Sequence, residues 1–338
     1  MNMIEVTEEI LQNILARYGI EEEITEFSHC LRNSSDNGWM KIITSVTTES
    51  GHYIVKLLRR NSFKRTIEEQ SAFSEYLREN GILTARRYRC GKHYRTDFRI
   101  DGYVFSVTVE DYVGEEIKLL TAAIAYKIGE LLARMHNISE RGDCHIYRGY
   151  TIFNITTDND VDGYDVLPRY AREGKIDKAV FARIRRERSR IMRAIQAGFD
   201  GLPVYASQGD VSINNLSIVN GEIAVFDYNI CGDMPLLSDM ILEGLLTAHE
   251  MEREEGFTVG DAYREFETGY FSVRPLSERE GAIYKTALSY AEAVWFSKIV
   301  QSYDKRGDSF DELFDAGDME GAARVIEKIM RDLEAITT

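Results

Sequence analysis

The sequence has little of what marks several common classes of protein. Its four cysteines, Cys30, Cys90, Cys144 and Cys231, are scattered singly with no CxxC pair, so neither a disulfide framework nor a zinc site is predicted. No apolar run approaches the length of a membrane span, and residues 1–16 are acidic without a continuous apolar stretch. From these two absences we expect neither a membrane span nor a signal peptide. We therefore expect a cytoplasmic protein.

Basic residues are also fewer than acidic residues. The chain of 338 residues has 41 Lys and Arg against 56 Asp and Glu, a formal net charge of -15. Such a chain repels phosphate polymers at long range, so we expect no binding to nucleic acid or to an anionic membrane. One basic stretch, residues 169–193, has apolar residues at near-helical spacing. It predicts an amphipathic helix with a solvated charged face, or alternatively a surface for a partner or for an anionic substrate.

The stretch that carries chemistry runs from residue 205 to residue 239. Two short β-type runs, 216–219 and 222–226, are separated by Asn220-Gly221, the dipeptide that favours a two-residue type I′ turn. Asp210 and Asn215 precede this hairpin and Asp227 follows it. Acidic and amide oxygens at the open end of a hairpin are suited to a divalent cation and a phosphoryl group.

The spacing of these residues repeats that of the protein-kinase catalytic loop, HRDxxxxN, followed by the metal-binding DFG aspartate. The region resembles the aminoglycoside phosphotransferase and choline kinase family, whose pattern is roughly HGDxxxxN, then IDFD, then GDPxxDL. The corresponding residues here are 208–215, 226–229 and 232–240. Gln208 replaces the usual histidine, and Asn229 replaces the second acidic residue.

The resemblance implies an α+β, protein-kinase-like bilobal fold. Residues 24–31, 39–47 and 53–58 read as strands of an antiparallel sheet, whereas residues 119–139 and most of the chain beyond residue 239 are helical in pattern. We therefore predict a nucleotide-binding N-lobe over residues 1–111, with an N-terminal accessory helix. A mainly helical C-lobe over residues 112–338 should carry the catalytic loop and the acceptor site.

The resemblance also implies a role for each residue of the motif. Asp210 would orient the acceptor hydroxyl or accept its proton, and Asn215 and Asp227 would hold Mg²⁺ between the β- and γ-phosphates. Lys56, in the strand Tyr53-Ile54-Val55-Lys56-Leu57, matches the phosphate-binding strand lysine. Strict alternation along the hairpin points Asn215 and Asp227 to opposite faces, so one of them must leave the ladder before the metal site.

Three further residues are assigned to the nucleotide site by the resemblance. The family places a glutamate in the helix after the lysine strand, and spacing puts it at Gln70, next to Glu69. We predict Glu69 as the partner of Lys56, because a carboxylate suits an ammonium group better than an amide does. Glu110 and Tyr112 lie where the family has its hinge between lobes, whose backbone reads the purine while a side chain packs on it.

The predicted function is transfer of the γ-phosphoryl group of ATP, with GTP as an alternative, to a hydroxyl of a small cationic molecule. Aminoglycosides, amino alcohols and homoserine are the types of acceptor that the resemblance implies, and we expect a monomer or a homodimer. The alternative is a catalytically silent nucleotide- or ligand-binding pseudokinase of the same fold, indicated by Gln208 and Asn229. A protein kinase is disfavoured, because the APE segment and an extended activation loop are missing between Asp227 and Asp239.

Overall fold

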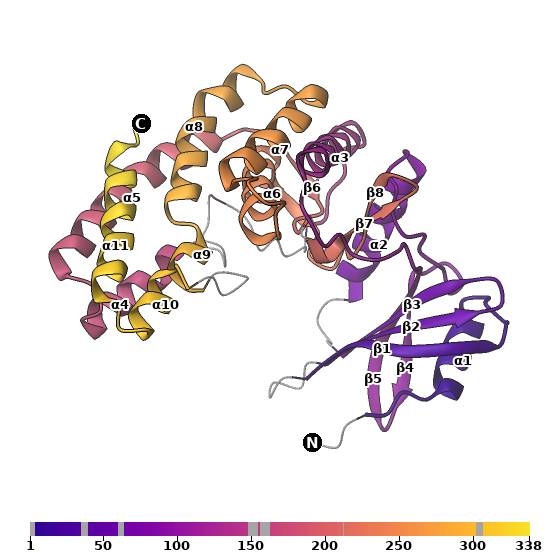
Figure 1. Ribbon diagram of the computed structural model, residues 1–338. Helices are drawn as coiled ribbons and strands as arrows, with labels where there is room; N and C mark the ends of the chain where they lie inside the picture. The colour runs from indigo at the N-terminus through magenta and orange to yellow at the C-terminus, as the bar shows by residue number, and fades with distance from the viewer. Residues whose placement is uncertain are drawn as a thin grey trace. The chain divides into compact units, whose positions relative to one another are not determined.

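The computed structural model describes residues 4–34, 40–59, 64–147, 155, 163–211, 213–301 and 307–338. The chain divides into two compact units (Figure 1), one of residues 1–115 and 217–229, the other of residues 116–216 and 230–338. This division differs from the predicted boundary after residue 111 in two ways. The first unit ends after residue 115, and it also contains the hairpin segment that the sequence analysis assigned to the C-lobe.

The first unit is built on a five-stranded antiparallel sheet with the order β1-β2-β3-β5-β4. Its strands are β1 (Ile24–Ser34), β2 (Met40–Thr48), β3 (His52–Arg59), β4 (Arg95–Ile100) and β5 (Tyr103–Asp111). Buried and half-buried residues alternate along β2, because successive side chains of a strand point to opposite faces of the sheet. The antiparallel sheet predicted from the period-two pattern is therefore present.

Helix α1 (Glu8–Arg17) covers the apolar face of this sheet (Figure 1). The side chain of Thr7 caps its N-terminus by accepting a hydrogen bond from the backbone of Ile10. Leu11, Ile14 and Leu15 of α1 are fully buried and belong to the same core cluster as the sheet residues. Burial of these side chains fixes the accessory helix to the sheet.

Helix α2 (Lys64–Glu79) and the hairpin of β7 (Leu216–Val219) and β8 (Glu222–Val225) complete the first unit. Asn220 and Gly221 have φ angles of 53° and 82°, as a type I′ turn requires. The backbone N–H of Val225 donates to the carbonyl of Leu83 at 3.0 Å. This bond ties the hairpin to the chain that follows α2.

The second unit is mainly helical. Its described helices include α3 (Ala122–Arg141), α4 (Leu167–Glu173), α5 (Lys178–Phe199), α6 (Leu236–Glu250), α7 (Val259–Val273), α8 (Glu278–Ala293), α9 (Phe296–Ile299), α10 (Phe310–Asp315) and α11 (Met319–Ala335). Two short strands, β6 (Val204–Ser207) and β9 (Gly232–Pro235), form an antiparallel pair. In the sequence, β6 precedes the hairpin and β9 follows it. Among the described residues, no helix combines the length and the hydropathy needed to cross a bilayer.

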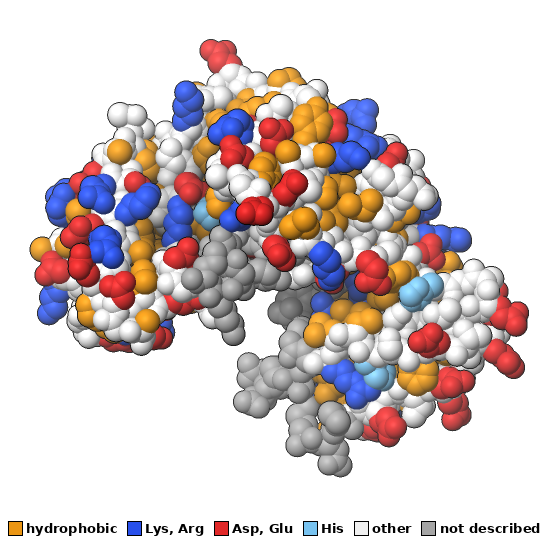
Figure 2. All heavy atoms as spheres, in the orientation of Figure 1, with side chains coloured by type: hydrophobic (Ala, Val, Ile, Leu, Met, Phe, Trp, Pro, Cys, Tyr) orange, Lys and Arg blue, Asp and Glu red, His pale blue; other side chains and the backbone are white. Residues whose placement is uncertain are grey.

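The basic stretch of the sequence forms α4 and α5. Helix α5 buries Ile184, Ile191 and Ile195 on one side, and Arg183 on the other forms a bidentate ion pair with Glu334 of α11. Figure 2 shows basic and acidic side chains interspersed over this part of the second unit. The predicted amphipathic helix with a charged outer face is confirmed.

Helices α3 and α7 approach each other closely at two glycines, Gly129 of α3 and Gly269 of α7. A Cβ atom on Gly269 would lie 2.0 Å from the carbonyl oxygen of Tyr126, a contact with backbone that cannot move aside. We expect Gly269→Ala to lower the free energy of unfolding by about 3 kcal/mol. The control is Gly281→Ala in α8, where a Cβ atom would meet no atom within 4 Å. This variant should raise the free energy of unfolding by up to about 1 kcal/mol. Urea unfolding of both variants measures the difference, and equal midpoints would contradict the close packing.

Candidate active site

The first unit contains a group of opposite charges, which we call the lysine-carboxylate cluster: the buried Lys56, Arg87 and Glu110 with the partly exposed Lys41 and Asp227. The Lys56 ammonium lies 2.8 Å from Glu110 Oε1 and 3.2 Å from Asp227 Oδ1. The Arg87 guanidinium pairs with the other oxygen of Glu110. The side chains of Lys56, Glu110 and Arg87 are each at most 5% exposed, so charge pairing rather than solvent stabilises them.

Strand register assembles this cluster. Lys56 of β3 pairs with Thr108 of β5, and Glu110 lies two residues further along β5, on the same face of the sheet. The backbone N–H of Arg87 donates to Glu75 Oε1 of α2 at 2.6 Å, which fixes the segment that carries the guanidinium. Neighbouring strands and a helix thus place the three groups together.

Asp227 reaches the cluster because the chain leaves the ladder of the hairpin. Strand β8 ends at Val225, and Asp227 has a φ angle of 56°, in the left-handed region. Burial alone would raise the pKa of Asp227, but Lys56, Lys41 and Arg87 hold that pKa well below its usual range. Asp227 is therefore a carboxylate at neutral pH, the form that binds a metal ion.

Glu69 and Gln70 of α2 make different contacts. Lys56 pairs with Glu110, where the sequence analysis had expected Glu69, and Glu69 Oε1 instead accepts from Arg65 Nε at 2.7 Å. Gln70, the position that spacing indicated, donates from Nε2 to the backbone oxygen of Asn229 at 2.8 Å. Gln70 thereby supports the segment that carries Asp227.

The two residues expected at the hinge also lie in the first unit. The side chain of Glu110 takes part in the cluster described above. The ring of Tyr112 stacks on His52 of β3, with ring centroids 4.0 Å apart, and its hydroxyl donates to Glu115 at 2.7 Å. A binding role of Tyr112 toward a purine stays a prediction.

The second unit contains the loop of Asp210 and Asn215. Gln208 Oε1 accepts the backbone N–H of Asp210 at 2.6 Å, so the glutamine that replaces the family's histidine helps to hold this loop. Asn215 lies in a short 3-10 turn, residues 213–215, before β7. Its Nδ2 group donates to both the carbonyl oxygen and the carboxylate Oδ2 of Asp210, each at 2.8 Å. Asn215 therefore orients the Asp210 carboxylate.

Two acids of α6, one helical turn apart, hold the chain on both sides of Asp210. Asp239 Oδ2 accepts from Ser207, and it lies 2.8 Å from His136 Nε2. Glu243 Oε2 accepts the backbone N–H of Val211 at 2.7 Å. Glu243 is not among the site residues predicted from the sequence, although an acid within the apolar run 236–248 indicates a buried partner.

Glu243 is a fully buried acid whose Oε1 has no hydrogen-bond partner among the described residues. Burial, followed by the negative charges of Asp239 and Asp210, raises its pKa well above the usual range. A carboxyl group with a raised folded-state pKa costs stability as pH rises from its unfolded pKa toward its folded pKa. Glu243 is therefore a source of pH-dependent instability in the second unit.

We expect Glu243→Gln to unfold at a higher urea concentration than the wild type above pH 4.5, the ordinary glutamate value. The advantage should grow with pH until the folded-state pKa is passed, because each pKa unit corresponds to about 1.4 kcal/mol. The control is Glu327→Gln on the exposed face of α11, which should shift stability equally at every pH. Parallel curves for the wild type and Glu243→Gln would contradict the raised pKa.

The donors present suit a hard divalent cation. Asp227 of the first unit has carboxylate oxygens and Asn215 of the second unit has an amide oxygen, and each is a ligand type that Mg²⁺ prefers together with phosphate and water. Within the described residues there is no group of three or more His, Cys, Asp and Glu that could hold a metal. A magnesium ion shared between protein and nucleotide does not need such a group, because phosphates and water complete its coordination.

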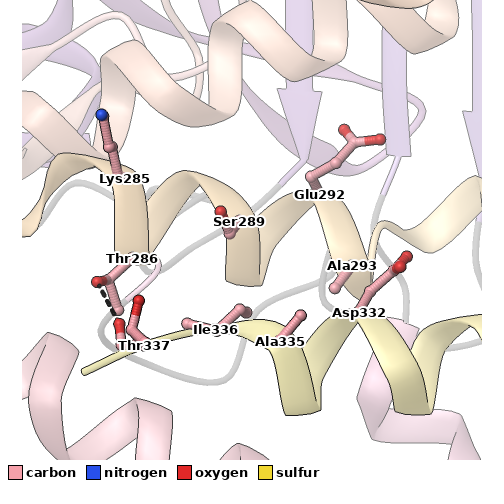
Figure 3. A pocket seen from close by; sticks show the side chains of 9 residues that line it. All are labelled: Lys285, Thr286, Ser289, Glu292, Ala293, Asp332, Ala335, Ile336 and Thr337. Atoms are coloured by element: carbon pink, nitrogen blue, oxygen red, sulfur yellow. Dashed lines mark hydrogen bonds between the residues drawn. The ribbon is translucent and has the colours of Figure 1, made fainter.

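A cavity of about 450 Å³ lies between α8, α11 and the C-terminal residues. Figure 3 shows Thr286 and Thr337 hydrogen-bonded at one end of it and Glu292 and Asp332 toward the other. Burial opposes ionisation of Glu292, but His249 and Lys298 lower its pKa to about 2. The described residues that line the cavity come from neither the Asp210 loop nor the hairpin.

The fold and these contacts define a class of protein. An antiparallel sheet whose strand lysine contacts an aspartate after a hairpin, and a helical unit with an Asp-Asn loop, are the parts of a protein-kinase-like phosphotransferase. Residues 44–276 match the model of the phosphotransferase enzyme family. This match covers more than half of the chain, and the chain belongs to that family.

Solved structures of similar fold include three kinases that align over most of both chains. An amicoumacin kinase has 16% identity and a TM-score of 0.59, over 96% of this chain and 94% of that one. A microcompartment-associated aminopropanol kinase has 17% identity and a TM-score of 0.59, over 97% and 99%. Spectinomycin phosphotransferase has 13% identity and a TM-score of 0.53, over 97% and 98%. Among curated protein sequences, none is significantly similar to this chain.

These likenesses confirm the predicted α+β, protein-kinase-like fold. The family match confirms the predicted resemblance to the aminoglycoside phosphotransferases. It also confirms the class of enzyme, a small-molecule kinase that transfers a phosphoryl group to a hydroxyl group.

Proposed function

We propose that this enzyme transfers the γ-phosphoryl group of ATP to a hydroxyl of a small cationic molecule, with Mg²⁺ as the divalent ion. The observation that carries the proposal is the contact of Lys56 with Asp227 at 3.2 Å. It joins a strand lysine suited to phosphate with a deprotonated carboxylate suited to a metal. Phosphoryl transfer depends mainly on such positioned charges.

Each residue has a role in this proposal. Lys56 holds phosphate oxygens, and Glu110 keeps its ammonium group in place. Asp227 and the amide oxygen of Asn215 would hold the divalent ion, which would supply positive charge against the phosphate groups. Asp210, oriented by Asn215, accepts the proton of the acceptor hydroxyl.

Two residues that the sequence analysis placed at the nucleotide keep proposed roles. Tyr112 would pack on the purine at the end of β5, where its ring already lies against His52. Glu69 would act on the nucleotide site only from α2, through the pair that it forms with Arg65. Gln70 contacts the segment of Asp227, and Glu110 contacts Lys56.

The nucleotide and the kind of acceptor are supported by solved structures of similar fold. The amicoumacin kinase was solved with AMP-PNP and Ca²⁺, and the spectinomycin phosphotransferase with ADP and spectinomycin. The net charge of -15 favours a cationic acceptor through long-range attraction. Amino alcohols, aminoglycosides and homoserine are the acceptors to be tried first.

The test is an assay of ADP formation with ATP, Mg²⁺ and a panel of these acceptors. We expect acceptor-dependent ADP formation that stops when EDTA removes the metal, and a phosphorylated product detected by mass spectrometry. Nucleotide binding without any ADP formation, with the panel or with water as acceptor, would favour the catalytically silent pseudokinase. Absence of nucleotide binding would contradict the proposed kinase activity.

A further inference from the structure

Asp227 is contacted by two lysines, and only one of them belongs to the motif discussed above. Lys56 Nζ lies 3.2 Å from Asp227 Oδ1, whereas Lys41 Nζ lies 3.5 Å from Asp227 Oδ2. Lys41 is the second residue of β2. Each oxygen of the carboxylate therefore faces its own ammonium group.

Strand register puts the two lysines on one face of the sheet. Lys56 of β3 pairs with Ile43 of β2, and Lys41 lies two residues before Ile43, so it shares that face. The loop between β1 and β2 lacks the GxGxxG pattern with which many kinases hold phosphates. A lysine at the start of β2 is a charged alternative to backbone N–H groups at this end of the sheet.

The two lysines differ in how firmly their charges are paired. Lys56 is 3% exposed and also contacts buried Glu110, whereas Lys41 is 18% exposed. Among the described residues, the carboxylate that Lys41 contacts is that of Asp227. An ammonium group that is partly exposed and near the limit of ion-pair distance can exchange this partner at little cost.

The net charge of the lysine-carboxylate cluster indicates which kind of ligand can replace Asp227 as the partner of Lys41. Lys41, Lys56 and Arg87 carry three positive charges against the two negative charges of Glu110 and Asp227. A divalent cation that approached Asp227 alone would meet two ammonium groups and be repelled. A polyphosphate anion offers both ammonium groups new oxygen partners and leaves the Asp227 carboxylate to the cation.

We propose that Lys41 is a second phosphate-binding residue of the nucleotide site. Lys41 and Lys56 each hold a phosphate oxygen of the nucleoside di- or triphosphate, and in doing so both release Asp227 to the divalent cation. This assignment rests on the proposed function, since it requires that the first unit bind a nucleotide. It predicts opposite effects of Lys41 on the binding of nucleotide and on the binding of metal alone.

The first experiment measures ADP binding by isothermal titration calorimetry, in EDTA and with Mg²⁺, for the wild type and Lys41→Met. We expect Lys41→Met to weaken ADP binding about 10-fold or more in both conditions, because a charge-assisted hydrogen bond to phosphate is lost. Adenosine, which has no phosphate, should bind both proteins equally. Lys41→Arg should restore most of the ADP affinity.

The second experiment measures binding of Mn²⁺ alone to the same proteins. Removal of the ammonium group beside Asp227 should tighten Mn²⁺ binding by about 3-fold or more. A residue that only positions Asp227 would give the opposite sign, with weaker metal binding and unchanged ADP binding in EDTA. The two signs together separate phosphate binding from a structural role.

The matched control is Lys92→Met, which removes an exposed lysine of the same unit and should change neither affinity. Lys41→Gln repeats the test if the methionine variant is poorly folded. A wild type that binds no ADP overturns the proposed function together with this assignment. A wild type that binds ADP no better than Lys41→Met overturns the assignment of Lys41 alone.

Discussion

Replacement of Asp210 by asparagine is expected to lower kcat for phosphoryl transfer by about 10²- to 10⁴-fold, the usual contribution of a positioned general base. The reason is local. Asn215 donates to the carboxylate of Asp210 at 2.8 Å and fixes its direction, and an amide in the same place cannot accept the acceptor's proton. Affinity for the nucleotide should change little, because Lys56 and Asp227 belong to the first unit.

The measurement is kcat from steady-state ADP release with a saturating acceptor, together with ADP affinity from calorimetry. The matched control is Asp332→Asn, which neutralises a partly exposed aspartate paired with Lys328 on α11 and should leave kcat unchanged. A variant Asp210→Asn that keeps more than about a tenth of wild-type kcat would exclude Asp210 as the proton acceptor.

The same substitution has a second consequence in α6. The charge of Asp210 is one of the causes that raise the pKa of Glu243, so Asp210→Asn should lower that pKa. The stability advantage of Glu243→Gln should therefore be smaller in the Asp210→Asn background than in the wild type. Two sites that did not interact would give additive changes.

Replacement of Glu110 by glutamine is expected to lower the free energy of unfolding by about 3–5 kcal/mol, as for other buried ion pairs that lose one partner. Glu110 neutralises both Lys56 and Arg87, and all three side chains are at most 5% exposed. A neutral amide would leave Lys56 paired with Asp227 alone and would remove the carboxylate that pairs with the buried Arg87 guanidinium.

Urea unfolding of Glu110→Gln measures this cost. The matched control is Asp97→Asn, which breaks the partly exposed pair of Asp97 with Arg95 at 2.6 Å and should cost less than about 1 kcal/mol. The double variant Arg87→Met with Glu110→Gln should recover part of the loss, since it also removes the buried guanidinium. A loss in Glu110→Gln no larger than in Asp97→Asn would show that the cluster does not depend on Glu110.

The two departures from the family pattern, Gln208 in the loop of Asp210 and Asn229 after the hairpin, each have a structural account. Gln208 places a side-chain oxygen 2.6 Å from the backbone nitrogen of Asp210, so an amide can support the loop where the family has histidine. Asn229 offers its backbone oxygen to Gln70. This contact uses the main chain, which explains why the side chain at residue 229 can differ without loss of the support.

The sequence by itself determined the local features of this protein. The hairpin follows from Asn220-Gly221, since few dipeptides accept two left-handed φ angles. The alternating strands and the amphipathic helices follow from periodicity, and the spacing of Asp210, Asn215 and Asp227 indicated the chemistry. The conflict in strand alternation was also visible, and its resolution is that Asn215 lies in a 3-10 turn while Asp227 follows the end of β8.

The tertiary structure alone decided which charges meet. Glu110, not Glu69, pairs with Lys56, because the register of β3 and β5 sets that contact and register arises from long-range pairing. In the same way, the register of β2 and β3 brings Lys41 to Asp227, and the packing of α6 brings Glu243 to the Asp210 loop. Residue type and spacing name the candidates for an ion pair, whereas only the packed chain sets their distances.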